Sequence, residues 1–166
     1  MNRLRAPIFF LIACATSGYA FLLNVRAGNE SSPVFGVTIP SGYRTWQLVS
    51  VHSTKGYLKA IWGNPTALQA YAHKTLPFPD GTVLVKQTWR SVALNSVPPA
   101  NISGPQDHIQ VMVKNSKKYA KTGGWGFGEW VNGVASGVAR EQSCFPCHTQ
   151  NAQVRGNDFV FTTYSP

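Results

Sequence analysis

The fold of this chain is decided by the stretch D-G-T-V-L-V-K-Q-T-W-R-S-V-A, residues 80–93. Its first two residues form a dipeptide that is typical of a turn, and the residues after them alternate in character. Neighbouring side chains of an extended strand point to opposite faces, so Val85 lies on one face while Leu84 and Lys86 share the other. The stretch predicts a largely apolar β-strand over residues 82–93, from which one lysine projects.

Similar but weaker patterns surround this strand. The 11 prolines and 15 glycines exclude a bundle of long helices. We therefore expect an α+β fold, a mainly antiparallel β-sheet with a few short peripheral helices. Further strands are predicted at residues 46–53, 57–62, 109–113, 125–129 and 159–163, a short helix after the capping residue Asn64, a loop over 97–105 and a helical turn over 142–148.

The motif C-F-P-C-H, residues 144–148, predicts a cofactor. Two cysteines separated by two residues and followed by histidine form the attachment motif of c-type haem. Cys144 and Cys147 would each bind a haem vinyl group, and His148 would be the axial ligand of the iron. Two other interpretations stay open, a thiol redox centre that uses the C-x-x-C pair and a structural zinc site. Zinc would need further ligands, and the third cysteine, Cys14, lies in the leader.

Few other side chains are candidates for the sixth position on the iron. Met112 falls within a predicted strand and is expected in the core, whereas His52, His73 and His108 are expected at the surface. We therefore expect an open position opposite His148, which favours small-molecule chemistry over pure electron transfer.

The N-terminus predicts export. Residues 1–26 contain Arg3 and Arg5, an uncharged apolar run over 8–25 and a closing Arg26. We expect a signal peptide or an N-terminal membrane anchor; cleavage after Ala20, acylation of Cys14 and retention all stay open, and a buried core helix is the alternative. Residues 27–41 are predicted as a linker and 42–166 as one domain. The domain should be periplasmic or otherwise exported, and possible anchoring follows from the leader.

The charge distribution argues against nucleic-acid binding. The formal net charge is +9, part of it in the leader, and no basic stripe interleaved with aromatic residues occurs. The one cluster of lysines is interpreted as a solvated turn, with docking of an acidic redox partner as the alternative. It comprises Lys114, Lys117, Lys118 and Lys121.

Several segments together resemble the cytochrome P-460 family. They are G-Y-R-T-W (42–46), A-I-W-G-N (60–64), P-F-P-D-G-T-V (77–83), K-N-S-K-K-Y (114–119), G-G-W-G-F-G (123–128), the C-x-x-C-H motif and D-F-V-F-T (158–162). The resemblance covers essentially the whole domain. It implies a small antiparallel sheet with peripheral helices, a homodimer and a five-coordinate haem.

The resemblance implies one of two activities. In cytochrome P-460 proper, a lysine is bonded to a haem meso carbon and hydroxylamine is oxidised to nitrous oxide or nitrite-level products, with electrons passing to an acceptor cytochrome. In the cytochrome c′-β branch, the link is absent and nitric oxide is bound without catalysis. The linking lysine resembles Lys86, which favours the enzyme; Lys59 is a second possibility, and Lys86 facing solvent is the alternative.

Other site residues are expected from the same resemblance. A carboxylate shortly before the C-x-x-C-H motif would act as general base, and here Glu141 is available, although Ala139 could occupy that position and Glu141 could instead cap the helix. Arg44 and Arg140 are candidates to pair with the haem propionates. Core packing is the expected role of the aromatic residues that could line the distal side, Phe78, Trp89 and Phe127.

Overall fold

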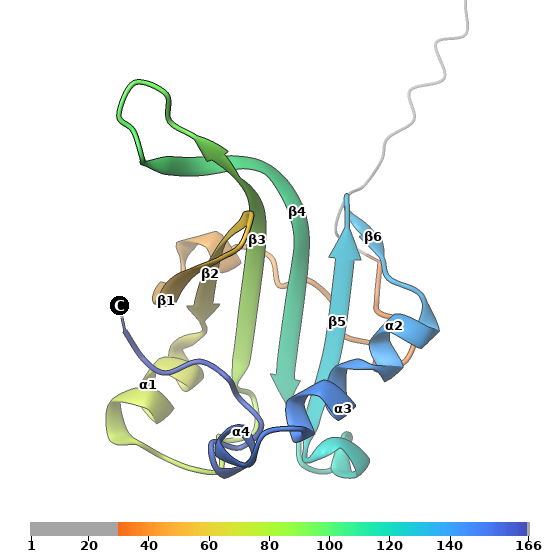
Figure 1. The fold of residues 1–166 in the computed structure, drawn as a ribbon. Helices are drawn as coiled ribbons and strands as arrows, with labels where there is room; N and C mark the ends of the chain where they lie inside the picture. The colour runs from red at the N-terminus through yellow and green to blue at the C-terminus, as the bar shows by residue number, and fades with distance from the viewer. Residues whose placement is uncertain (1–29, 166) are drawn as a thin grey trace, which may run out of the picture.

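The fold is a single antiparallel β-sheet with short helices around it (Figure 1). A computed structural model describes residues 30–165. Each strand pairs with the next one in the chain, in the order β1 to β6. This α+β architecture confirms the predicted fold class. The strands are β1 (Gln47–Thr54), β2 (Tyr57–Gly63), β3 (Val83–Ala93), β4 (Asn101–Lys114), β5 (Trp125–Val131) and β6 (Val134–Ala135).

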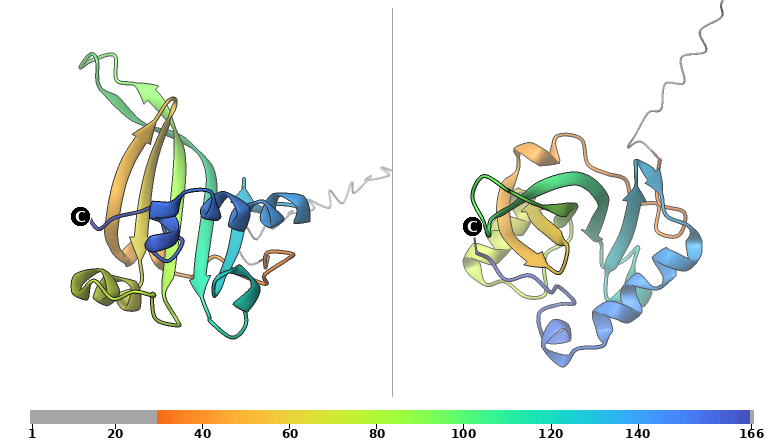
Figure 2. Two further views of the ribbon diagram at one scale, coloured as in Figure 1. Left: turned by 60° about the horizontal axis from the view of Figure 1, so that its bottom comes forward. Right: turned by 45° about the horizontal axis from the view of Figure 1, so that its top comes forward.

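The C-terminal helices lie across one face of the curved sheet (Figure 2). The helix α1 packs at one end, where the Asn64 side chain accepts hydrogen bonds from the backbone N–H groups of Ala67 and Val83, both at 3.0 Å. This cap joins the start of the helix to the start of β3. The helical segments are η1 (Tyr43–Thr45), α1 (Pro65–His73), η2 (Ala120–Thr122), α2 (Val138–Gln142), α3 (Cys144–Thr149) and α4 (Ala152–Gly156).

The start of one predicted strand and the existence of another are wrong. Strand β4 begins at Asn101, inside the predicted loop over 97–105, because Gly104 and Pro105 fall where the register between β3 and β4 shifts. A proline at such an irregularity interrupts no regular ladder of hydrogen bonds. The predicted strand over 159–163 is an unpaired segment that crosses the sheet face instead.

The predicted linker is also corrected where the structure describes it. From residue 30 the chain packs on the sheet: Val37 is 3% exposed, and the Ser32 hydroxyl donates to the carbonyl oxygen of Phe127 at 3.0 Å. The predicted leader, residues 1–26, lies outside the described residues. Within residues 30–165, no helix is long and apolar enough to cross a membrane.

Alternation along the strands divides the core into two layers. Leu84 packs in the layer under the C-terminal segment, together with Phe127 and Val160, whereas Val85 packs in the opposite layer with Val37. Lys86 therefore projects on the side of the C-terminal helices, as its spacing from Leu84 requires.

Candidate functional site

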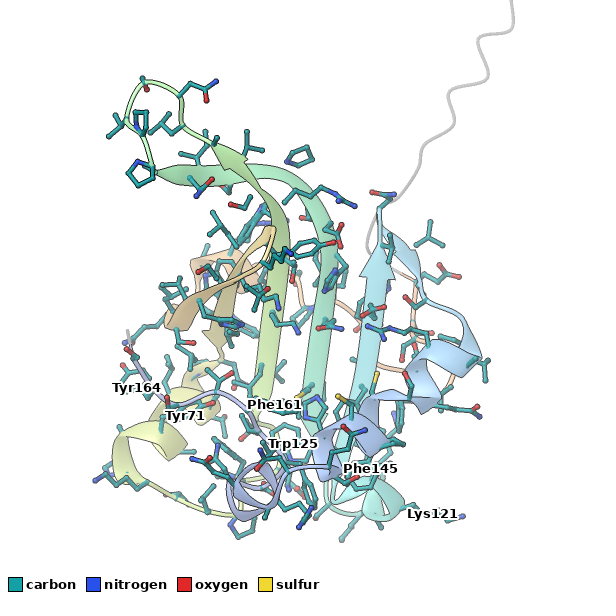
Figure 3. The ribbon with its side chains drawn as sticks, viewed as in Figure 1. Tyr71, Lys121, Trp125, Phe145, Phe161 and Tyr164 are labelled. Carbon is teal, nitrogen blue, oxygen red and sulfur yellow. The ribbon has the colours of Figure 1, made fainter. Side chains whose placement is uncertain are left out.

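A cavity of about 720 Å³ lies between the sheet and the helices α2 and α3. Phe161, from the C-terminal segment, lies over the middle of the sheet at this place (Figure 3). The lining residues are His52, Lys59, Ile61, Leu84, Lys86, Gln110, Val111, Met112, Phe127, Gly128, Arg140, Ser143, Cys144, Pro146, Cys147, His148, Gln150, Val160, Phe161 and Thr162.

The helix α3 brings both cysteines of the motif to the cavity. Cys144 and Cys147 are three residues apart, so they share one face of the helix, and both thiols are free. Burial raises the pKa of the Cys144 thiol to about 11. A thiol redox centre needs the opposite, a lowered cysteine pKa, so this environment disfavours the thiol redox interpretation.

His148 is held in a defined orientation beside the cysteines. Its Nδ1 lies 2.6 Å from the carbonyl oxygen of Phe159, a distance at which Nδ1–H donates, and this leaves Nε2 free to bind a metal. The rings of Phe127 and Phe161 pack against the imidazole, with centroids 5.1 and 4.6 Å away. Burial lowers the pKa of His148, which favours the neutral imidazole that metal binding requires.

The sheet supplies the opposite wall of the cavity, and Lys86 projects from it. Lys86 pairs in register with Ile61 of β2 and Gln110 of β4, and all three line the cavity. Burial, and secondarily the positive charge of Lys59, lowers the pKa of Lys86 to about 8. A much larger fraction of this amine is therefore neutral at pH 7 than for a lysine in water.

These residues fit a covalently held haem. Two free thiols and an imidazole with an unused nitrogen open on one side of a cavity whose other side is mostly apolar. In the described part of the chain, no group of three or more histidine, cysteine or acidic side chains could hold a bare metal ion. A single protein ligand suits an iron whose remaining ligands come from a porphyrin, whereas structural zinc is not supported.

Comparison with known proteins agrees with this geometry. Residues 40–162 match the family Cytochrome P460. The chain belongs to the cytochrome P460 family. It is thus a haem-binding cytochrome of the mono-haem type, and the predicted resemblance is confirmed. No curated protein matches the chain.

The predicted catalytic carboxylate does not reach the cavity of this cytochrome. Glu141 is fully buried, and its Oε2 accepts a hydrogen bond from the backbone N–H of Val34 at 2.9 Å, while Oε1 has no partner. Neither Glu141 nor the exposed Ala139 lines the cavity, because α2 turns the first towards the N-terminal segment. Among the described lining residues there is no carboxylate.

Glu129 is the acid that sequence reasoning missed. It pairs in register with Gln110, whose amide donates to Glu129 Oε2, so it lies on the same face of the sheet as Lys86. Arg140 donates to both its oxygens, from Nε at 2.7 Å and from Nη2 at 2.9 Å. Burial pushes the pKa of Glu129 up, but the hydrogen bonds from Arg140 and Gln110 outweigh this and hold it below its ordinary value.

The two predicted propionate ligands differ in position. Arg140 lines the cavity, although its guanidinium is bound to Glu129. Arg44 does not line it; the guanidinium stacks over the ring of Tyr43 at 4.7 Å, and Tyr43 belongs to the opposite core layer. Arg44 is therefore excluded as a propionate ligand within one chain.

The remaining candidates are distributed between cavity, core and surface. Met112 and His52 line the cavity, and His52 is otherwise exposed. His73 is exposed, and His108 binds Asp107 at 2.7 Å, both away from the cavity. Of the three candidate aromatic residues, Phe127 lines the cavity, whereas Phe78 and Trp89 do not.

Proposed function

We propose that the protein is an exported c-type cytochrome that oxidises hydroxylamine. In this proposal Cys144 and Cys147 hold the haem through thioether bonds, and His148 is the axial ligand. The observation that carries the proposal is the placement of Lys86, which projects into the cavity from the wall opposite the C-x-x-C-H motif. The family's linking lysine resembles Lys86, and a lysine on this wall would face a porphyrin held by the motif, which supports the proposal.

The chain supplies orientation, exclusion of water and a reactive amine. When bound, haem supplies an iron that binds a small nitrogenous molecule and accepts its electrons. The rings of Phe127 and Phe161, together with Met112, make much of the cavity wall apolar and so limit the entry of water.

The environment of Lys86 favours formation of the link. A carbon–nitrogen bond is formed by a neutral amine, and with a pKa of about 8 on the order of one-tenth of Lys86 is neutral at pH 7. The link would replace one N–H bond of Lys86 and one C–H bond of the haem, so its formation would release two protons and two electrons. An oxidant of the peroxide class would accept these electrons during maturation.

Proton removal from the substrate is the weaker part of this site. Glu129 is ionised but lies behind Gln110 and Arg140, which line the cavity and bind its oxygens. A general base should lie within hydrogen-bond reach of the proton that it accepts. We therefore expect slow turnover. The lack of a carboxylate among the described lining residues favours a second candidate function, nitric oxide binding without catalysis.

The proposed activity requires an electron acceptor. The exposed lysines Lys117, Lys118 and Lys121 lie on and before the turn η2, and Lys121 points away from the sheet (Figure 3). This basic surface suits an acidic acceptor cytochrome. The proposed homodimer could use the tip of the β3–β4 hairpin, which exposes the apolar side chains of Val92 and Val97.

The substitution Lys86→Met tests the enzyme proposal. The haem-loaded wild type should show the abnormal ferrous Soret band for which the family is named, and Lys86→Met should show the spectrum of ordinary high-spin haem c. Lys59→Met is the matched control and should leave the abnormal band in place.

Intact mass measures the link independently, because a lysine bond to haem removes two hydrogen atoms from the holoprotein, whereas thioether addition to the vinyl groups removes none. If Lys86→Met leaves the spectrum unchanged and the wild type has the full summed mass of polypeptide and haem, the link is absent. A wild type with an ordinary spectrum that binds nitric oxide but does not consume hydroxylamine would support the second candidate function.

A further inference from the structure

The buried ion pair between Lys114 and Asp158 has no place in the function proposed so far. The Lys114 side chain is 5% exposed and that of Asp158 is 9% exposed. Lys114 Nζ lies 2.8 Å from Oδ1 and 2.7 Å from Oδ2 of Asp158, so the pair is made through both oxygens. The predicted solvated turn is therefore wrong for Lys114, in contrast to the exposed Lys117.

The pair is fixed from several sides. Lys114, the last residue of β4, also donates to the carbonyl oxygen of Gly123 at 3.0 Å. Asp158 Oδ2 accepts from the backbone N–H of Phe78 at 2.9 Å, and the carbonyl oxygen of Asp158 accepts from Trp125 Nε1 at 2.8 Å. Side chain and backbone of Asp158 are therefore both tied to the sheet and to the loop before β3.

The next residue, Phe159, is the one that orients His148. Asp158 and Phe159 have φ values of +51° and +64°, in the left-handed region that a bulky side chain such as phenylalanine avoids. Such a conformation persists only where surrounding contacts hold it. Its result is that the Phe159 carbonyl oxygen meets His148 Nδ1 at 2.6 Å.

We propose that Lys114 and Asp158 are positioning residues for His148. The ion pair holds the left-handed turn at residues 158–159, and the turn presents the Phe159 carbonyl to the imidazole. A hydrogen bond at Nδ1 fixes the tautomer and ring orientation and makes Nε2 a stronger donor to a metal. The inference rests on the proposed function, in which His148 is the axial ligand of haem.

A stronger axial donor has a consequence that can be measured in the haem-loaded protein. It stabilises ferric over ferrous iron, so it lowers the reduction potential, and it stiffens the iron–histidine bond. If the pair acts only on packing, its loss lowers the stability of the fold but leaves both properties of the folded protein as they were.

The test compares Lys114→Met with the double variant Lys114→Met/Asp158→Asn. The double variant leaves no unpaired buried charge, and the asparagine oxygen can still accept from Phe78, so it should fold even if the single variant does not. The matched control is Lys117→Met, which removes a positive charge from an exposed lysine three residues away. All are measured as holoproteins.

The measurements are the midpoint potential and the iron–histidine stretching frequency in the ferrous state. We expect a higher potential and a lower frequency in the double variant, and no shift in the control. Folded variants with wild-type values of both would overturn the positioning role alone. A wild type without any iron–histidine stretch would overturn the proposed axial ligand itself, so the two failures are distinguishable.

Discussion

The contact between Arg140 and Glu129 decides whether Arg140 serves the fold or the cofactor. Arg140 comes from α2 and donates from Nε and Nη2 to the two carboxylate oxygens of Glu129 on β5, which is a bidentate pair. The substitution Arg140→Met keeps much of the length of the side chain but removes the charge and both donors. It leaves Glu129 with hydrogen bonds from Gln110 and Ser136 only.

The expected loss of stability follows from the burial of the two partners. Removal of one partner from a fully buried ion pair costs about 3–5 kcal/mol. Here the Glu129 side chain is 6% exposed but that of Arg140 is 56% exposed, so solvent already screens part of the interaction. We expect Arg140→Met to lower the free energy of unfolding by about 2 kcal/mol at pH 7, or the melting temperature by about 8 °C.

The loss should depend on pH in one direction. The pKa of Glu129 is lowered in the folded protein, so the stability that the ionised carboxylate contributes is present above the ordinary glutamate pKa. It is lost as the pH falls through the lowered value. The difference between wild type and Arg140→Met should therefore be largest near neutral pH and should shrink in acid.

Urea unfolding of the holoproteins at pH 7 and pH 4 measures this difference. The matched control is Arg44→Met, which removes an arginine that binds no carboxylate of residues 30–165 and lies away from the cavity. A loss below about 0.5 kcal/mol that is equal at both pH values would refute the reasoning. It would mean that the pair with Glu129 does not form in the holoprotein and that Arg140 is free to bind a haem propionate.

Three further predictions concern a buried acid, a closely packed glycine and one of the two motif cysteines. Burial raises the pKa of Glu141, so the contribution of Glu141 to stability falls as the pH rises above the ordinary glutamate pKa. Glu141→Gln should remove this pH dependence of the free energy of unfolding and stabilise the fold by about 1 kcal/mol at pH 7, as measured by urea unfolding. Gly123→Ala should destabilise the fold by about 2 kcal/mol, because φ is +65° and a Cβ would lie 2.3 Å from the Phe159 ring. Calorimetry measures this loss, and the control is Gly137→Ala, which has no atom within 4 Å of the added Cβ. Cys147→Ala should retain haem through one thioether to Cys144, which intact mass would show; complete loss of covalent haem would contradict two independent attachments.

Local sequence patterns were sufficient to predict which side chains of one strand or helix lie on the same face. The alternation around Lys86 places it with Leu84, and both line the cavity. The spacing of Cys144 and Cys147 similarly places both thiols on one side of a helix. In these cases the period of the strand or helix alone determines which side chains share a face.

Residues whose partners are distant in the chain could not be predicted in this way. Lys114 belongs to a run that looks solvated, and its burial depends on Asp158, 44 residues later. Glu129 and Glu141 are both plausible acids in the sequence. Only the pairing of β4 with β5 turns Glu129 towards Gln110, whereas α2 turns Glu141 towards the N-terminal segment. These contacts depend on the register between strands, which cannot be inferred from the period of a single strand or helix.

The division of the cavity between two parts of the chain has a consequence for biogenesis. All six strands precede Cys144, so in an exported chain the residues of the sheet wall, Lys86 among them, leave the membrane before the residues that are proposed to tether the porphyrin. Attachment can then act as the closing step of maturation. In a newly exported polypeptide whose sheet has formed, the porphyrin would bind on the open face of that sheet. The C-terminal segment would then close the cavity.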